Sequence, residues 1–295
     1  MNSIEFLSLL NQKPTLVLDG ATGTNLQKRG LPIGTAPETW LFDNPTSISQ
    51  LYSDFVQAGS DIILTCTFGG NRVRLGHANL AERITDVNRI AVELARQVTK
   101  GKDVLVAGSI GPTGEMMQPF GTLGEEQAFE IYAEQAKILI EAGVDLLVIE
   151  TQFDLTEAIA AVKAVRSLSD DIALVCSFSY DRGVRTMMGV KPVQMAETFN
   201  PMAVDALGVN CGKSLEDNLN VLTTLKENTN KPIWFKPNAG LPTSNPDGTT
   251  SYDVTPQMMA DQVPAWIGAG AKLVGGCCGT SPEHLAAIAR RVKGN

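Results

Sequence analysis

Eight short runs of apolar, largely β-branched residues recur along this 295-residue chain, and they constrain its fold more than any other feature. The runs are TLVLD (15–19), DIILT (61–65), DVLVAGS (103–109), DLLVIE (145–150), DIALVCSF (171–178), VDALGV (204–209), PIWFK (232–236) and KLVGG (272–276). They are nearly continuous and do not alternate strictly with polar residues, which is typical of strands buried on both faces of a parallel sheet.

Stretches with apolar residues at three- and four-residue spacing separate these runs and predict amphipathic helices. The predicted helices cover 47–58, 80–98, 125–142, 155–168, 192–199, 215–227, 256–268 and 282–292. Ser281-Pro282-Glu283 combines an N-cap residue, a proline at the first helical position and an acidic first turn. The alternating pattern predicts one domain over 1–295, an α/β fold of the (β/α)8 TIM barrel type, with an open doubly wound sheet as the alternative.

Three proline- and glycine-rich stretches, 30–45, 111–124 and 237–250, each follow a predicted strand. In a barrel, the loops that follow the strands lie at the carboxyl-terminal face, where the active site is built. We therefore expect the catalytic residues at this face.

The composition argues against several classes of partner. A formal net charge of −8 disfavours nucleic acid and anionic membranes, since both need a basic surface. The first residues, MNSIEFLSLLNQKP, lack the basic and apolar regions of a signal peptide, and no apolar run approaches the roughly 20 residues of a membrane span. An odd number of cysteines, five, indicates a reducing compartment. We expect a cytoplasmic protein whose cysteines are thiols or metal ligands.

Three cysteines stand at predicted strand ends. Cys211 follows the sixth run, and Cys277 and Cys278 follow the eighth. In a barrel, the sixth and eighth strands flank the seventh, so the three sulfurs can converge. Adjacent cysteines make strained disulfides, whereas three thiolates suit zinc and leave its fourth tetrahedral position open, as in catalytic sites. The alternative is that they are small buried apolar residues, the interpretation we favour for Cys176 inside the fifth run.

An open zinc site with three thiolate ligands is electron-rich. This weakens its ability to activate water, but it suits binding a substrate thiol as a nucleophilic thiolate. Such a sulfur attacks an electrophilic carbon, most simply a methyl group. The cysteine pattern therefore predicts methylation of a thiol.

One turn and two acidic residues complete the candidate site. The turn DGATGT (19–24) leaves the first run, and backbone N–H groups in such a turn can hold a carboxylate or a phosphate. Asp19 at its start and Glu150 at the end of the fourth run are candidates to bind an ammonium group, since a buried carboxylate is costly unless paired. The alternatives are an ordinary tight loop, a structural role for Glu150, and a metal-free barrel enzyme that holds a phosphate at this turn.

Seven segments carry a family resemblance: DGATGT, TCTFGG, IGPTGE, IET, GVNC, PNAG and GGCCGTSPEH, in this order. Together they resemble the homocysteine S-methyltransferase family over essentially the whole chain, and within it the homocysteine-binding module of cobalamin-dependent methionine synthase. PNAG and IGPTGE look less like the betaine- or S-methylmethionine-dependent members. The resemblance implies a zinc-bearing barrel that takes homocysteine as methyl acceptor and forms methionine.

The resemblance also implies the roles of individual residues. The matches to zinc ligands are Cys211, Cys277 and Cys278, and Asn238 in PNAG matches a residue that can occupy the fourth zinc position when substrate is absent. Asp19 and Glu150 match carboxylates near the substrate amine. Gly23 and Thr24 lie in the turn expected to hold the substrate carboxylate.

Cys66 departs from the family pattern, because methionine synthases usually have TNTFG where this chain has TCTFG. We expect Cys66 either to alter how the substrate sits or to add a thiol near the zinc.

The methyl donor is the second departure. Methionine synthases continue into folate, cobalamin and reactivation modules, whereas this sequence ends at Asn295, and neither His77 nor His284 lies in a corrinoid motif. Few aromatic residues stand in the long loops to enclose a small cationic donor: Trp40, Phe42, Phe68, Phe120, Phe153 and Tyr252. We therefore predict methylcobalamin on a separate corrinoid protein as donor, with S-methylmethionine or betaine as the alternative. An accessory module that docks a corrinoid protein without catalysis would not need all three cysteines.

Overall fold

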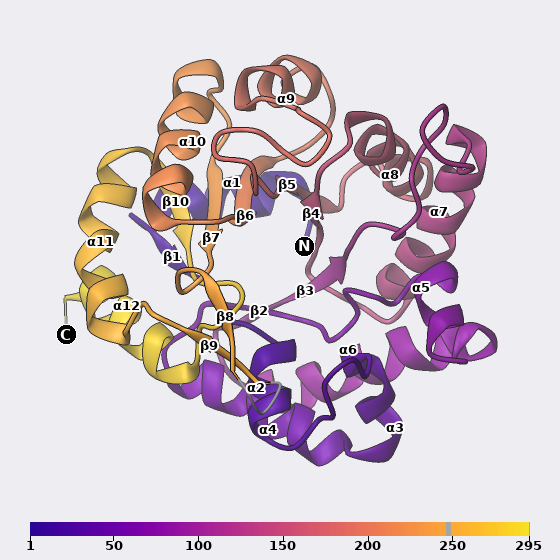
Figure 1. Cartoon of the computed structure of the whole chain (residues 1–295), viewed down its shortest axis with the longest axis horizontal. Coiled ribbons are helices and arrows are strands. Elements are labelled where there is room, and N and C mark those ends of the chain that lie inside the picture. Colours follow the sequence, from indigo (N-terminus) through magenta and orange to yellow (C-terminus); the bar gives the residue numbers. More distant parts are fainter. Residues whose placement is uncertain (246–248, 295) are drawn as a thin grey trace.

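The computed structural model describes residues 1–245 and 249–294, and its centre is a barrel of eight parallel strands (Figure 1). The strands are β1 (Leu16–Val17), β2 (Ile62–Leu64), β3 (Leu105–Ile110), β4 (Leu146–Gln152), β5 (Ala173–Phe178), β6 (Ala206–Cys211), β7 (Ile233–Pro237) and β10 (Ala271–Val274). They pair in the order β1-β10-β7-β6-β5-β4-β3-β2, and a parallel bridge between Leu18 and Ile62 joins the two ends. The predicted TIM barrel is confirmed, and the open sheet is excluded.

A ring of helices surrounds the barrel, as predicted from the apolar spacing (Figure 1). The eight predicted helices correspond to α4 (Pro45–Gln57), α6 (Ile84–Thr99), α7 (Glu125–Glu141), α8 (Leu155–Leu168), α9 (Pro192–Phe199), α10 (Leu215–Asn228), α11 (Pro256–Gly268) and α12 (Pro282–Lys293). Side-chain caps determine where several begin. Asp154 accepts hydrogen bonds from the first turn of α8, and Thr255 does so for α11.

The loops on the carboxyl side of the strands contain short elements that the sequence pattern did not predict. These are α2 (Gly23–Lys28), the 3-10 turn Pro37–Thr39, α3 (Trp40–Asp43), α5 (Arg72–His77), and the antiparallel pair β8 (Pro242–Ser244) and β9 (Thr250–Tyr252). The first residues of the predicted helix 80–98 form a separate 3-10 turn, Ala81–Arg83. Part of the predicted loop 237–250, at 246–248, lies outside the described residues. We call the face formed by these loops the mouth.

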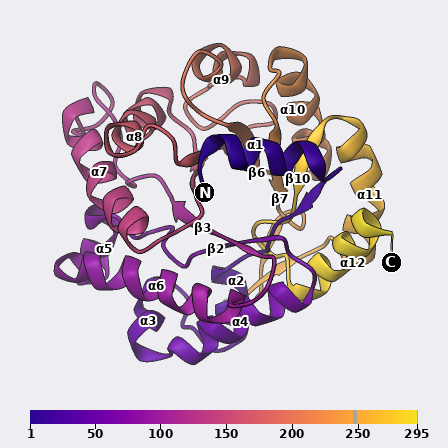
Figure 2. The same cartoon turned by 180° about the vertical axis from the view of Figure 1, so that it is seen from behind.

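A further helix, α1 (Ser3–Gln12), closes the opposite end of the barrel (Figure 2). Its first turn is fixed by a capping box, in which Asn2 accepts from the Glu5 N–H and Glu5 accepts from the Asn2 N–H. Phe6 and Leu10 are buried against the inward-facing apolar side chains of the strands. These inward-facing side chains include Leu16, Ile62, Leu146, Val175, Trp234 and Leu273. The barrel interior is therefore a packed core, and α1 covers its base.

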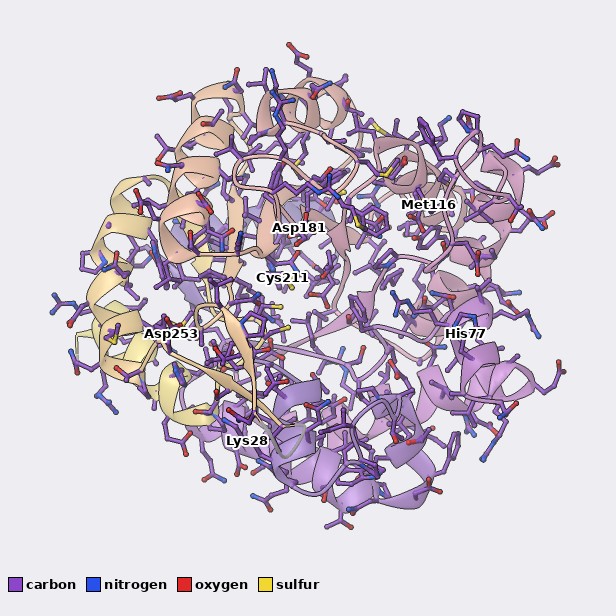
Figure 3. The ribbon with its side chains drawn as sticks, in the orientation of Figure 1. Lys28, His77, Met116, Asp181, Cys211 and Asp253 are labelled. Carbon is purple, nitrogen blue, oxygen red and sulfur yellow. The ribbon has the colours of Figure 1, made fainter. Side chains whose placement is uncertain are left out.

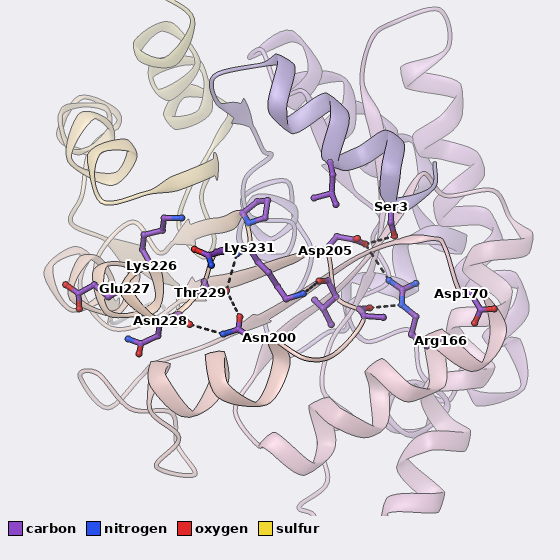
Figure 4. Close-up of a pocket in the computed structure, with 15 residues that line it drawn as sticks. Ser3, Arg166, Asp170, Asn200, Asp205, Lys226, Glu227, Asn228, Thr229 and Lys231 are labelled. Carbon is purple, nitrogen blue, oxygen red and sulfur yellow. Dashed lines mark hydrogen bonds and ion pairs between the residues drawn. The ribbon is translucent and has the colours of Figure 1, made fainter.

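A cavity of about 910 Å³ lies beside α1 on this base, on the side remote from the mouth (Figure 4). Several of the polar and charged groups that line it have partners. Ser3 and Arg166 both contact Asp205, and Lys231 donates to the carbonyl oxygens of Met202 and Val204. These contacts link α1, the end of α8 and the segments before β6 and β7 at the base of the barrel. No helix among the described residues is both long enough and apolar enough to cross a membrane.

We predict that Phe6→Ala lowers the free energy of unfolding by about 3–5 kcal/mol, because it opens a cavity beneath the barrel core. Ile4 on the same helix is 81% exposed, so Ile4→Ala is the matched control and should change the stability by less than about 0.5 kcal/mol. Denaturant unfolding measures both. Equal stabilities of the Phe6 variant and the unsubstituted protein would show that α1 does not seal the core.

Candidate functional site

The inward-facing side chains change from apolar to polar towards the mouth. On β4, Leu146 and Val148 belong to the interior core, and Glu150 is the next residue on that face. On β7, Lys236 follows Trp234 in the same way. The polar residues at this level, all buried, are Ser109, Glu150, Ser177, Asn210 and Lys236. The barrel therefore ends in a polar layer beneath the mouth.

Three thiols meet above this layer, and we call Cys211, Cys277 and Cys278 the cysteine trio. Their Sγ atoms all lie within 4.8 Å of one another, and those of Cys211 and Cys277 are 3.0 Å apart. Figure 3 shows Cys211 near the middle of the mouth. Among residues 1–245 and 249–294, no other cluster of His, Cys, Asp or Glu side chains is placed to hold a metal ion.

The end of β7 lies between the two cysteine-bearing segments. The Asn238 N–H donates to the Cys211 carbonyl, at 3.1 Å, and the Ala239 N–H donates to the Cys278 carbonyl, at 2.9 Å. The Cys277 N–H in turn donates to the carbonyl of Pro237, at 2.8 Å. The strand order β6-β7-β10, inferred from the sequence, is thus what brings the trio together.

The turn that carries Cys277 and Cys278 requires glycine on both sides. A Cβ at Gly276 would lie 2.3 Å from Thr280 Cγ2, and Gly279 has φ +82° with Tyr252 Cγ only 2.3 Å from a Cβ placed there. Tyr252, on β9, therefore packs directly over this turn. A larger residue at Gly276 would require Thr280 to move, and one at Gly279 would require Tyr252 to move.

Asn210 supports the trio from below. Its Nδ2 donates to Thr151 Oγ1 at 2.7 Å and lies 3.6 Å from Cys211 Sγ. Its Oδ1 accepts from Ser177 Oγ and from the Thr151 N–H. Since both ends of the amide are fixed, its N–H donor is held towards the sulfur, where it stabilises a thiolate.

The donor set fits a soft metal ion. Hydrogen bonds from the Cys211 and Cys277 thiols hold the pKa of Cys278 well below its usual range, so the trio favours at least one thiolate. Asn238 Nδ2 donates to the Gly212 carbonyl, while its buried Oδ1 has no hydrogen-bond partner in the described chain. Three sulfurs together with a buried amide oxygen that lacks a partner are a donor set that zinc accepts.

The two predicted carboxylates lie buried at the same level. Asp19 Oδ2 accepts from the Leu64 N–H at 2.7 Å, and its Oδ1 forms an ion pair with Lys236 Nζ at 2.5 Å. Glu150 Oε1 accepts from Ser109 Oγ at 2.5 Å. Burial raises the pKa of Glu150 to about 7, against the opposing attraction of Lys236. Asp19 thus has a cationic partner, whereas Glu150 has a neutral one.

The predicted carboxylate-binding turn lies beside the trio. Gly23 and Thr24 begin α2, and the N–H groups of a first helical turn have no intrahelical acceptor. Thr24 Oγ1 accepts from the Gly279 N–H at 3.3 Å, which ties this turn to the last loop. Apart from Cys66, the residues named as site candidates from the sequence therefore lie around one mouth.

Two other cysteines lie elsewhere. Cys176 is buried in β5, as expected. Cys66 is buried in the outer core, and its N–H donates to the Tyr52 hydroxyl. The expectation of an additional thiol near the metal is wrong, because the side chain of Cys66 packs between the barrel and its helices. The sequence interpretation also missed Lys236 and Asn210, although each occupies an inward position at the end of an apolar run.

Comparison with known proteins agrees with this geometry. A sequence model of the homocysteine S-methyltransferase family matches residues 16–292. The homocysteine S-methyltransferase YbgG of Bacillus subtilis is 30% identical, and the alignment covers 98% of this chain and 97% of the relative. The methionine synthase of Mycobacterium tuberculosis is 28% identical over 98% of this chain, but the chain spans only 25% of that relative's length.

A solved structure has the same fold. The metallated form of the homocysteine methyltransferase MmuM from Escherichia coli is 27% identical, with a TM-score of 0.82. The superposition covers 96% of this chain and 98% of MmuM.

We predict that the trio holds about one divalent metal ion per chain, as three thiolates and an amide oxygen suit. Cys277→Ala should lose the metal while retaining the circular dichroism spectrum, because the trio lies above the packed core. Cys66→Ala, which removes a buried thiol outside the trio, is the control and should retain the metal. Elemental analysis measures both. An unfolded Cys277 variant would show instead that the site is structural.

Proposed function

The chain belongs to the homocysteine S-methyltransferase family, and we propose that it methylates the thiol of homocysteine to give methionine, using zinc held by the cysteine trio. The observation that carries the proposal is the convergence of three thiols at the mouth of a barrel matched by this family. We further propose that residues 1–295 act as one catalytic domain. The cytoplasmic location expected from the sequence stays a prediction.

The roles of the protein groups follow from their chemistry. When bound, zinc would supply a positive centre that keeps the acceptor sulfur a thiolate at neutral pH. The trio supplies negative charge, so the sulfur stays nucleophilic. Asn210 orients Cys211, and Asn238, whose buried amide oxygen has no partner in the described chain, would offer that oxygen as a fourth ligand to the metal. The acceptor sulfur then attacks the methyl carbon, and the donor's leaving group departs with the bonding electrons.

Recognition of the amino-acid end is assigned to the layer beneath the trio. Asp19 and Glu150 provide negative charge for the acceptor's ammonium group, and the first turn of α2, at Gly23 and Thr24, provides N–H groups for its carboxylate. The metal-free phosphate-binding alternative would leave the trio without a role.

We predict that Glu150→Gln raises KM for homocysteine by about tenfold with little change in kcat. The substitution removes the attraction between the Glu150 carboxylate and the acceptor's ammonium group, which is equally strong in the bound state and in the transition state. The control acceptor is 4-mercaptobutyrate, which has the same thiol and carboxylate but no amine, and its KM should not rise. A carboxyl group is uncharged below its pKa, so KM for homocysteine should increase as the pH falls through about 7, and the Gln variant should lose this dependence. Equal losses for the two acceptors would move Glu150 from recognition to chemistry or structure.

The proposed donor is a methylated corrinoid carried by a separate protein. Exposed apolar side chains stand on loops that follow four different strands: Ile33, Met116, Phe120, Val184, Met187 and Leu241. Exposed apolar side chains around a site are typical of protein docking. Two loop aromatic rings also have cationic partners, since Arg83 lies over Phe42 and Arg74 over Phe68. Those rings are not free to enclose a sulfonium or betaine.

We predict fast methyl transfer from a methylated corrinoid protein, slow transfer from free methylcobalamin, and none of comparable rate from S-methylmethionine or betaine. Phe120 is 73% exposed, and Phe120→Ala should slow only the reaction with the corrinoid protein, because free methylcobalamin does not need the docking surface. Steady-state assays of the four donors side by side test this. Fast turnover with S-methylmethionine or betaine would establish the small-donor alternative.

A further inference from the structure

Lys236 is a buried cation inside the proposed acceptor site. Its side chain is 4% exposed and that of its partner Asp19 is 1% exposed, with 2.5 Å between Nζ and Oδ1. A buried ion pair is weak evidence for stability, because desolvation offsets much of the attraction. We therefore look for a functional role, since a lysine at this level of the barrel lies beside the proposed acceptor site.

Two carboxylates share this layer with Lys236. Asp19 is in direct contact with it through the ion pair, and Glu150 is buried at the same level of the barrel. Lys236 is thus a buried cation in the same layer as both proposed amine-binding carboxylates. Ion pairs of this depth interact strongly because the local dielectric constant is low.

The net charge of this layer decides which acceptor it can hold. Above about pH 7, where Glu150 is ionised, Asp19 and Glu150 contribute two negative charges and Lys236 one positive charge, which leaves one negative charge for one ammonium group. Without Lys236, two buried negative charges would face the acceptor. An acceptor that brings a carboxylate but no ammonium would then meet strong repulsion.

We infer that Lys236 is a specificity-determining residue, which neutralises Asp19 and so admits thiol carboxylates that lack an α-ammonium group, alongside homocysteine. This inference rests on the proposed function, because it concerns the same acceptor site. Its ligand class is a short ω-thiol carboxylate, for which 4-mercaptobutyrate is the probe.

The test is calorimetric binding of homocysteine and 4-mercaptobutyrate to the zinc-loaded protein, with kcat and KM measured in parallel. In Lys236→Met the ratio of the Kd for 4-mercaptobutyrate to that for homocysteine should rise by about tenfold or more, chiefly through weaker binding of 4-mercaptobutyrate. The double variant Asp19→Asn/Lys236→Met has the same net charge as the unsubstituted site. Its ratio should return to within about threefold of the original.

The matched control is Lys231→Met, since Lys231 precedes β7 at the base, where its Nζ donates to the carbonyls of Met202 and Val204, far from the mouth. Its Kd ratio should not change. Equal weakening of both acceptors in Lys236→Met, or a double variant no closer to the original ratio than the single one, would overturn the inference and give Lys236 a structural role. Failure of homocysteine to bind the unsubstituted protein would instead overturn the proposed function, and the inference with it.

Discussion

Closure of the sheet is the constraint on which the rest of the molecule depends. One parallel bridge, between Leu18 and Ile62, joins the first and second strands. Because this bridge closes the sheet, every strand of the barrel has two neighbours. Because side chains alternate between the two faces, closure directs every second residue to a common axis. Cys211 and Cys277 are 66 residues apart in sequence, and Asp19 and Lys236 are 217 apart, yet each pair is in contact.

Along this axis the apolar layers, which stabilise the fold, are separate from the polar layer proposed to carry the chemistry. Phe6 and Leu10 of α1 cover the base, and apolar side chains, among them Trp234, fill the middle, so the packed core ends before the polar layer begins. Buried charges are tolerated in that layer because they have partners: Asp19 has Lys236 and the Leu64 N–H, and Glu150 has Ser109. Above this layer, Cys211 stands at the end of β6, and the glycine-flanked turn after β10 carries Cys277 and Cys278.

The sequence predicted the parts of the structure that rest on periodicity. Buried parallel strands and amphipathic helices leave long patterns, and the cysteine spacing follows from strand order, so the barrel and the meeting of the three thiols were accessible. α1 was missed because no strand precedes it in the alternating pattern, and β8 and β9 because a short polar hairpin has no buried face. Lys236 was read as the end of a strand, since a single sequence does not show that a lysine two residues after Trp234 faces inwards. Cys66 was misplaced for a related reason: it lies in the loop after β2, where side chains no longer alternate between the interior and the helix-facing side of the barrel.

Charge balance links the two halves of the site. A zinc ion with three thiolates carries a net negative charge, and a bound acceptor thiolate adds another. The layer beneath therefore cannot also present two uncompensated carboxylates without repelling the carboxylate of the acceptor. A lysine paired with Asp19 lowers the negative charge at that end, and in the proposed reaction Glu150 would then attract the amine. In the proposed reaction the metal end would thus stay electron-rich, as a nucleophilic sulfur needs, because the recognition end would be close to neutral once an ammonium group is bound.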